Sequence, residues 1–226
     1  MRIKGVIFDF NGTLFFDNDK HILAWNEISK QIRHKKITED ELYNHFNGVP
    51  NANIIMYMKN QQATNGEIQE YSLLKEKYYR SFCKEDQKNF HLVKGSEEFF
   101  DFLKSKEIPF TIASASVKPN IDFFVESFQL NQWFDIKKIV YDNGSYENKV
   151  KMFQKAAELL KIEMKDILIL EDSLSGIKNA FQSGCENIIV VCSKQQADEF
   201  LKLPGVIGTI ENFDEIYSII KHQQLF

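Results

Sequence analysis

Short apolar runs alternate with helical patterns along most of this chain, and this alternation constrains its fold more than any other feature. The apolar runs cover residues 5–8, 109–113, 136–140, 167–170 and 187–191, with a weaker sixth at 206–210. Apolar residues at helical spacing lie between them, for example in 149–160 and 175–183. Strands that alternate with helices form right-handed crossovers and a mostly parallel sheet buried on both faces. The sequence therefore predicts an α/β fold.

One long interval, residues 17–90, interrupts this alternation. It shows no strand pattern, and apolar residues recur at helical spacing, as in Ile22, Trp25 and Ile28. Because the interval is long and self-contained, we expect an inserted helical cap domain at 17–90 and a core domain at 1–16 and 91–226. The alternative, helices packed into a single core, is less consistent with that length.

Composition and charge exclude several classes of protein. A net charge of −4 argues against a nucleic-acid partner, which usually requires a basic surface. No apolar run approaches the ~20 residues of a membrane span, and the N-terminal run is too short for a signal peptide. The three cysteines, Cys83, Cys185 and Cys192, have no metal-ligand spacing, so we expect reduced thiols in a cytoplasmic protein. No membrane partner is expected.

Polar residues follow three of the predicted strands. Because ligands bind beyond the carboxyl ends of strands in an open parallel sheet, these residues are expected to converge on one edge. They are Asp9 and Asn11 after the first run, Ser114-Ala115-Ser116 after the second, and Glu171-Asp172-Ser173 after the fourth.

The acids of this group suggest a metal site. Carboxylates packed together resist ionisation unless a cation joins them, and oxygen ligands of this kind suit Mg²⁺. In the alternative interpretation, Glu171 and Asp172 only cap the following helix together with Ser173; the acid at Asp9 favours the metal. Beside Mg²⁺, a carboxylate can attack phosphorus and form an aspartyl phosphate. Gly12 would admit backbone N–H groups to the phosphate.

These residues resemble the motifs of the haloacid dehalogenase-like (HAD) superfamily, in the same order and over essentially the whole chain. The matching motifs are Asp9-Phe10-Asn11-Gly12-Thr13-Leu14, Ser114, a downstream lysine, and Glu171-Asp172-Ser173-Leu174-Ser175-Gly176. The resemblance implies a Rossmann-like core with strand order 3-2-1-4-5 and a helical cap after the first motif.

By position, the resemblance also implies the roles of individual residues. Asp9 is the implied nucleophile and a metal ligand, and the remaining ligands are Asp172, Glu171 and the backbone carbonyl of Asn11. Ser114 would hold the phosphoryl group. The catalytic lysine is expected at Lys149, with Lys151 as the alternative.

Within the superfamily, the chain is most similar to β-phosphoglucomutase-like members. The similarity rests on Ser114-Ala115-Ser116 and on the segment from His21 to Trp25. It implies that substrate or phosphate contacts come from Gly12, Thr13, Ala115, His21, Trp25 and Lys75. Without the resemblance, Trp25 reads as a core residue, His21 as a surface residue and Lys75 as part of a solvated helix face.

Asn11 departs from the family pattern, which usually has Asp at this position as the general acid–base. Loss of such a group typically costs ~10²- to 10⁴-fold in rate. Three interpretations follow: a slower phosphatase, a protein that binds phosphate compounds without turnover, or a replacement introduced by an experimenter. Because every other catalytic position is present, we favour the first. Deamidation of the Asn11-Gly12 pair could also regenerate an acid.

The sequence therefore predicts an Mg²⁺-dependent phosphomonoester hydrolase, a monomer or weak dimer, that acts on a small phosphorylated metabolite such as a sugar phosphate through an aspartyl phosphate. A β-phosphoglucomutase-type transferase is the alternative enzyme. It is disfavoured because a mutase depends more on the acid–base, and because Gly48-Val49-Pro50-Asn51 lacks the arginine with which β-phosphoglucomutases hold the distal phosphate. A binding protein without turnover is the non-enzymatic alternative. Dehalogenases need no metal acids, so Glu171 and Asp172 argue against that chemistry.

Overall fold

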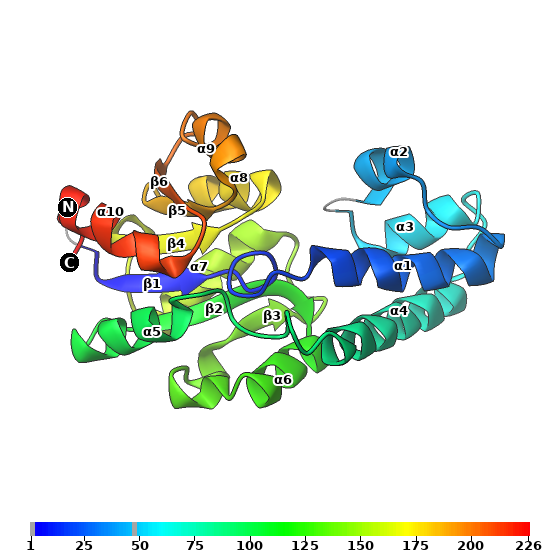
Figure 1. Ribbon diagram of the computed structural model, residues 1–226, viewed down its shortest axis with the longest axis horizontal. Helices are drawn as coiled ribbons and strands as arrows, with labels where there is room; N and C mark the ends of the chain where they lie inside the picture. The colour runs from blue at the N-terminus through cyan, green and yellow to red at the C-terminus, as the bar shows by residue number, and fades with distance from the viewer. Residues whose placement is uncertain (1–2, 47–48) are drawn as a thin grey trace. The chain divides into compact units, whose positions relative to one another are not determined.

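The computed structural model describes residues 3–46 and 49–226 and shows an α/β protein that divides into two compact units (Figure 1). The core unit comprises Met1–Phe16 and His91–Phe226, and the helical unit comprises Asp17–Phe90. These boundaries are those that the sequence predicts. The function of the helical unit as a cap stays a prediction. Gly48, the first residue of the segment 48–51 that lacks the arginine of β-phosphoglucomutases, lies outside the described residues.

The core unit is built on a six-stranded parallel sheet in the order β3-β2-β1-β4-β5-β6. The predicted α/β class and Rossmann-like order are confirmed, and β6 extends the predicted order by one strand. The strands are β1 (Gly5–Phe8), β2 (Phe110–Val117), β3 (Val140–Asp142), β4 (Ile167–Glu171), β5 (Ile188–Val191) and β6 (Val206–Ile210).

Both faces of the sheet are buried, because residues that alternate along a strand point to opposite sides. Ile7 of β1 and Ile169 of β4 belong to a core cluster with Phe153 of helix α7 (Lys149–Leu160) and Ile177 of helix α8 (Leu174–Gln182). Phe8 points the other way into a group of aromatic rings, whose members are Phe99, Phe100, Phe110, Phe134 and Phe213. The central strand is therefore fixed by packing on both sides just before Asp9.

In the described residues of the core unit, five helices lie between its strands, and one follows the last strand. The five are α5 (Ser96–Ser105), α6 (Lys118–Ser127), α7 (Lys149–Leu160), α8 (Leu174–Gln182) and α9 (Lys194–Phe200), and α10 (Ile216–Gln223) follows β6. Helix α7 has the predicted bounds, and α8 lies one residue before the predicted range of 175–183.

The helical unit contains α1 (Asn18–Arg33), α2 (Glu39–Glu41), α3 (Asn51–Met58) and α4 (Asn65–Glu85), with a π-helical turn at Leu42–Phe46. Its described residues include no strand. Trp25, Ile28 and Ile55 contribute to a hydrophobic core of its own. Helix α4 begins with a capping box in which Thr64 and Glu67 satisfy each other's backbone N–H groups. This unit thus has its own core and its own helix-start signal.

The strand predicted at 136–140 is largely wrong. Ile136–Lys138 forms a short 3-10 turn, and only Val140 of the predicted run lies in β3. The Asp135 carboxylate accepts a hydrogen bond from the backbone N–H of Lys137 at 3.1 Å, which stabilises the turn.

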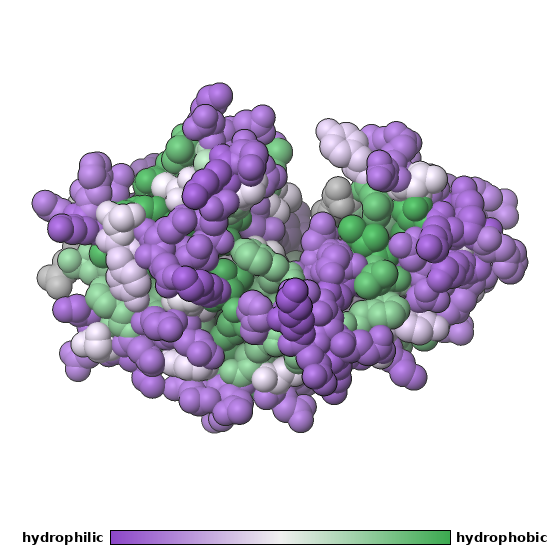
Figure 2. Space-filling view, in the orientation of Figure 1, coloured by the Kyte–Doolittle hydropathy of each residue, from purple (hydrophilic) through white to green (hydrophobic). Residues whose placement is uncertain are grey.

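Hydrophilic side chains cover much of the molecular face drawn in Figure 2. Among the described residues, no helix combines the length and the apolar character needed to cross a membrane.

Candidate active site

The register between β1 and β4 places two acids side by side at the edge of the sheet. Phe8 is paired with Leu170, so the next residue of each strand, Asp9 and Glu171, are neighbours. The backbone N–H of Asp9 donates to the Leu170 carbonyl at 2.9 Å and continues the ladder. The two carboxylates therefore meet because two buried strands end at the same level.

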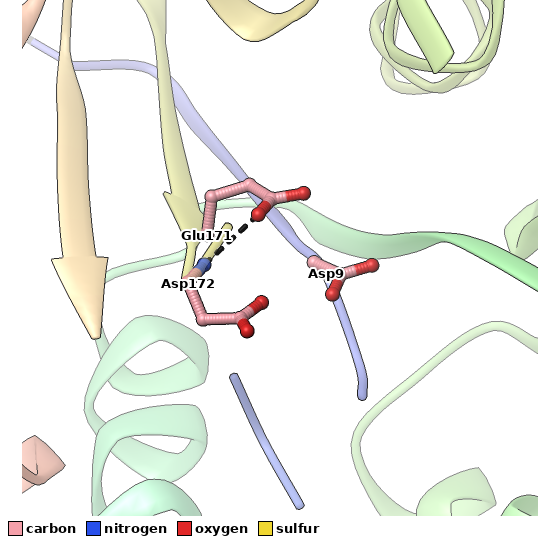
Figure 3. A group of neighbouring side chains, drawn as sticks. All are labelled: Asp9, Glu171 and Asp172. Atoms are coloured by element: carbon pink, nitrogen blue, oxygen red, sulfur yellow. Dashed lines mark hydrogen bonds between the residues drawn. The ribbon is translucent and has the colours of Figure 1, made fainter. Parts of the chain in front are cut away.

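Asp172 adds a third carboxylate to this pair (Figure 3). One oxygen from each of Asp9, Glu171 and Asp172 lies within 4.8 Å of the others. Burial raises the pKa of Asp9 to about 7, with Glu171 adding to the shift and Lys149 opposing it. Burial likewise raises the pKa of Asp172 to about 8, with Glu171 and Asp9 adding to it. The cluster thus carries more negative charge than its protein surroundings compensate.

Lys149 is the cation that the protein supplies to this cluster. Its Nζ donates to Asp9 Oδ1 at 2.7 Å and also forms an ion pair with Glu171 Oε1. Burial alone would lower the pKa of Lys149, but the two carboxylates raise it above its usual value. Lys151 is exposed, and its Nζ lies 3.3 Å from Gln154 Oε1. Of the two lysines considered, the structure brings Lys149 to the acids.

Glu171 is completely buried and held by several donors. Its Oε2 accepts from the backbone N–H of Asp172 at 2.9 Å (Figure 3). The same oxygen also accepts from the backbone N–H of Ser173 at 3.0 Å and from the Ser173 hydroxyl at 3.1 Å. Ser173 is itself the N-cap of α8 and accepts from the N–H of Gly176. The helix-capping interpretation is therefore correct for Ser173, and Glu171 both stabilises this turn and faces Asp9 and Lys149.

Two glycines leave room for the acids. Gly12 has a φ of +78°, and a Cβ there would overlap the Asp172 carboxylate. In α8, a Cβ at Gly176 would overlap the Glu171 carboxylate. Thr13, which is fully buried, donates to Asp172 Oδ1 at 3.3 Å. The Gly12–Thr13 turn therefore positions Asp172.

Asn11 faces the serines of β2. Ser116 Oγ donates to Asn11 Oδ1 at 2.7 Å, and Ser114 Oγ lies 3.4 Å from the same oxygen. The sequence analysis places Ser116 in the polar group at this edge but assigns it no role, although it lies two residues after Ser114 on the same side of an extended strand. Ala115 between them is exposed. Binding of phosphate by Gly12, Thr13, Ser114 and Ala115 stays a prediction.

In the helical unit, the three predicted substrate-binding residues His21, Trp25 and Lys75 lie close together. Lys75 is 3% exposed; its Nζ lies 2.7 Å from His21 Nδ1 and 5.5 Å from the centre of the Trp25 ring. The alternative of a solvated helix face at Lys75 is therefore wrong. His21 stacks on Tyr79, with ring centres 4.1 Å apart, and is only half-exposed. Trp25 is buried in the core of this unit, as its core interpretation predicts. Contact of these three with a substrate stays a prediction.

The chemistry of the donor set fits a hard divalent cation. The cluster offers carboxylate oxygens without any soft ligand, and two of its three acids have raised pKa values because they are buried together. Asp9, Glu171 and Asp172 are therefore the residues that could hold a metal ion in the described part of the chain.

Comparison with known proteins agrees with this fold. Residues 6–190 match the family model of the haloacid dehalogenase-like hydrolases. A HAD hydrolase of family IA, variant 3, from Entamoeba histolytica has a crystal structure with 31% sequence identity and a TM-score of 0.89, covering 97% of this chain and 98% of its own. The chain therefore belongs to the haloacid dehalogenase-like hydrolase family, as its motifs predict.

Two further relatives match almost end to end. A phosphorylated carbohydrates phosphatase from Thermotoga maritima is 21% identical over 225 residues, which cover 97% of this chain and 99% of the relative. A β-phosphoglucomutase from Clostridium difficile has a crystal structure with 19% identity and a TM-score of 0.78, covering 98% and 99% of the two chains. The latter shows a shared fold. The prediction that the chain is a HAD-family enzyme of the hydrolase class is confirmed.

Proposed function

We propose that this protein is an Mg²⁺-dependent phosphatase that hydrolyses a small phosphorylated carbohydrate through a phosphoryl group on Asp9. The observation that carries the proposal is the position of Asp9: it is buried, in contact with Lys149, and within 4.8 Å of Glu171 and Asp172. Lys149, together with a cation bound by the three carboxylates, would give Asp9 the cationic surroundings that an attack on a phosphate dianion requires.

The residues of the site have separate roles in this proposal. Asp9 attacks phosphorus, and Lys149 compensates charge on both the carboxylate and the transferring group. Ser114 and the backbone at Gly12 donate hydrogen bonds to the phosphoryl oxygens. Asp9, Glu171 and Asp172 would hold Mg²⁺, with the backbone carbonyl of Asn11 as a fourth ligand. The bound ion would neutralise repulsion between the carboxylates and the phosphate.

The substrate class is supported by the relative from Thermotoga maritima, whose name states that it acts on phosphorylated carbohydrates. In the helical unit, His21 and Lys75 supply polar groups beside the ring of Trp25, a combination suited to a hydroxyl-rich substrate. We propose that this unit closes over the substrate as a cap and excludes water during transfer.

Phosphomutase activity is the second candidate, and the similarity to β-phosphoglucomutase along nearly the whole chain favours it. A mutase, however, has to protonate and deprotonate two sugar hydroxyls, and Asn11 cannot exchange a proton at neutral pH. We therefore rank hydrolysis first.

A phosphate-release assay with aryl and sugar phosphates tests the proposal. We expect turnover that needs Mg²⁺, stops on addition of EDTA, and is lost in Asp9→Ala. A mutase would instead convert a sugar 1-phosphate to its 6-phosphate without releasing phosphate. Binding of phosphate compounds with no turnover of any of them would contradict both enzymatic candidates.

A further inference from the structure

Asn11 is held in one orientation by two hydroxyl groups. The backbone N–H of Ser116 donates to Ser114 Oγ at 3.2 Å, so the Ser114 proton is left to donate elsewhere, and Asn11 Oδ1 lies 3.4 Å away. The Ser116 hydroxyl donates to the same oxygen at 2.7 Å. Since both hydroxyls are donors here, the amide presents its oxygen to them and its NH₂ group to the opposite side. The Asn11 NH₂ group is therefore turned away from the two serines.

An amide at this place affects the two halves of the reaction unequally. In the first half, an Asp9 oxygen forms a bond to phosphorus, the bond from phosphorus to the ester oxygen breaks, and the leaving oxygen departs with the electron pair. If the leaving group is acidic, it needs no proton from the protein. The Asn11 NH₂ group can then stabilise the developing negative charge by a hydrogen bond.

In the second half of the reaction, a hydrogen bond from Asn11 cannot replace the missing general base. The oxygen of a water molecule forms a bond to phosphorus, the bond from phosphorus to Asp9 breaks, and the carboxylate and inorganic phosphate are released. The water molecule must give up a proton. Asn11 cannot accept it, so the proton passes to solvent or to the phosphate. Absence of a general base typically costs ~10²- to 10⁴-fold.

We infer that Asn11, positioned by Ser116, makes water attack on phospho-Asp9 the slow step, so that the phosphorylated protein accumulates during turnover of substrates with acidic leaving groups. This inference rests on the proposed function, because it requires phosphoryl transfer to Asp9. It adds a positioning role for Ser116 and a preference for acyl, enol, aryl or anomeric phosphates over esters of ordinary alcohols.

Rapid-quench kinetics with p-nitrophenyl phosphate and Mg²⁺ test the inference. We expect a burst of nitrophenolate close to one equivalent of protein, followed by slow steady turnover, and a protein mass increased by one phosphoryl group in the acid-quenched sample. Aryl phosphates with different leaving groups should share one kcat to within about twofold. In Asn11→Asp, the burst should disappear and kcat should rise by ~10²-fold or more. Peptide mass analysis of the parent protein verifies that position 11 is still Asn.

Ser116 variants test the positioning role. Loss of one hydrogen bond to the amide should lower the burst rate constant about fivefold in Ser116→Ala, with an unchanged melting temperature, and Ser116→Thr should restore it. A Ser116→Ala variant with the parent burst rate would overturn this role.

The possible failures are distinguishable. Turnover that depends on Asp9 but shows no burst, with a kcat that varies steeply with the leaving group, overturns the inference and leaves the phosphatase intact. No turnover and no phosphorylated protein with any substrate overturns the proposed function, and the inference with it.

Discussion

Lys149 shows how one side chain can decide the electrostatics of a buried site. It is the first residue of α7, and its ammonium group contacts both Asp9 and Glu171. Two buried carboxylates that share one ammonium group depend on it strongly, because removing one partner leaves uncompensated charge away from water.

We expect Lys149→Ala to lower the free energy of unfolding of the Mg²⁺-free protein by about 3 kcal/mol at pH 8. Phosphatase activity should fall by ~10²-fold or more. The matched control is Lys151→Ala on the same helix, whose exposed side chain should change stability by no more than about 0.5 kcal/mol. Urea unfolding followed by circular dichroism measures the difference. Equal losses in the two variants would contradict the role of Lys149.

The choice between Lys149 and Lys151 was open in the sequence because the two are only two residues apart. What separates them is the start of α7, where the Asn148 side chain accepts from the backbone N–H of Lys151 and caps the helix. Asp9, Glu171 and Asp172, in contrast, were predictable from the ends of two apolar runs. The burial of Lys75 was not, because it depends on packing against residues distant in the sequence.

At the scale of elements, apolar runs located the strands best where both faces of the sheet are covered. The runs at 5–8, 167–170 and 187–191 closely match β1, β4 and β5, in which every residue is buried. The run at 136–140 gave a wrong strand position because its first part forms a turn before the short strand β3. Strand β2 continues past the predicted end at Ala113 to Val117, through the two serines that face Asn11. A hydrophobic pattern does not register such residues.

Helix α8 has a glycine, Gly176, in its first turn, where the carboxylate of Glu171 needs the space. In an open helix, Gly→Ala stabilises by up to about 1 kcal/mol. We expect Gly176→Ala to displace Glu171 and to weaken Mg²⁺ binding at least tenfold, as measured by titration calorimetry. Gly66→Ala is the control, because Gly66 lies exposed in the first turn of α4 with no crowding atom, so it should preserve binding. Unchanged Mg²⁺ affinity in Gly176→Ala would argue against this spatial role.

The short helix α2 depends on an ion pair that acid should break. Burial would raise the pKa of Glu41, but hydrogen bonds from Arg33 and the backbone N–H of Thr38 lower it to about 2. A carboxyl whose folded pKa lies below its unfolded value stabilises the fold above about pH 4.5, and loses this contribution as the pH falls toward 2.

We therefore expect Glu41→Gln to be less stable than the parent at pH 6 and nearly equal to it at pH 2. Urea midpoints measured across this range test the expectation. Glu39→Gln, on the exposed side of the same helix, should show no such pH-dependent difference. A constant gap between Glu41→Gln and the parent from pH 6 to 2 would contradict it.

At the scale of the whole molecule, the two units have separate hydrophobic cores. Each unit also contains one of the two tryptophans. Trp25 is buried in the helical unit. Trp133 belongs to the core unit, where its indole N–H donates to Asp101 at 2.8 Å. The acidic cluster lies entirely in the core unit, so a metal ion bound there should stabilise mainly that unit.

Single-tryptophan variants can test this difference. In Trp25→Phe, fluorescence reports the core unit, and Mg²⁺ at about 100 times its dissociation constant should add about 2.7 kcal/mol to its stability. In Trp133→Phe, which reports the helical unit, the melting temperature should rise much less. EDTA or Asp172→Asn should remove the shift. Equal shifts from both reporters would show that the two units unfold together.

The peptide N–H of Val93 donates to the carbonyl of Leu14 at 2.8 Å, so the chain leaves the sheet for the helical unit and returns to it at adjacent points. Because the two ends of this insertion are neighbours, its length and sequence can change without altering the order of the strands. In related proteins, substitutions within residues 17–90 could change substrate specificity while the core unit and its acidic cluster stay the same.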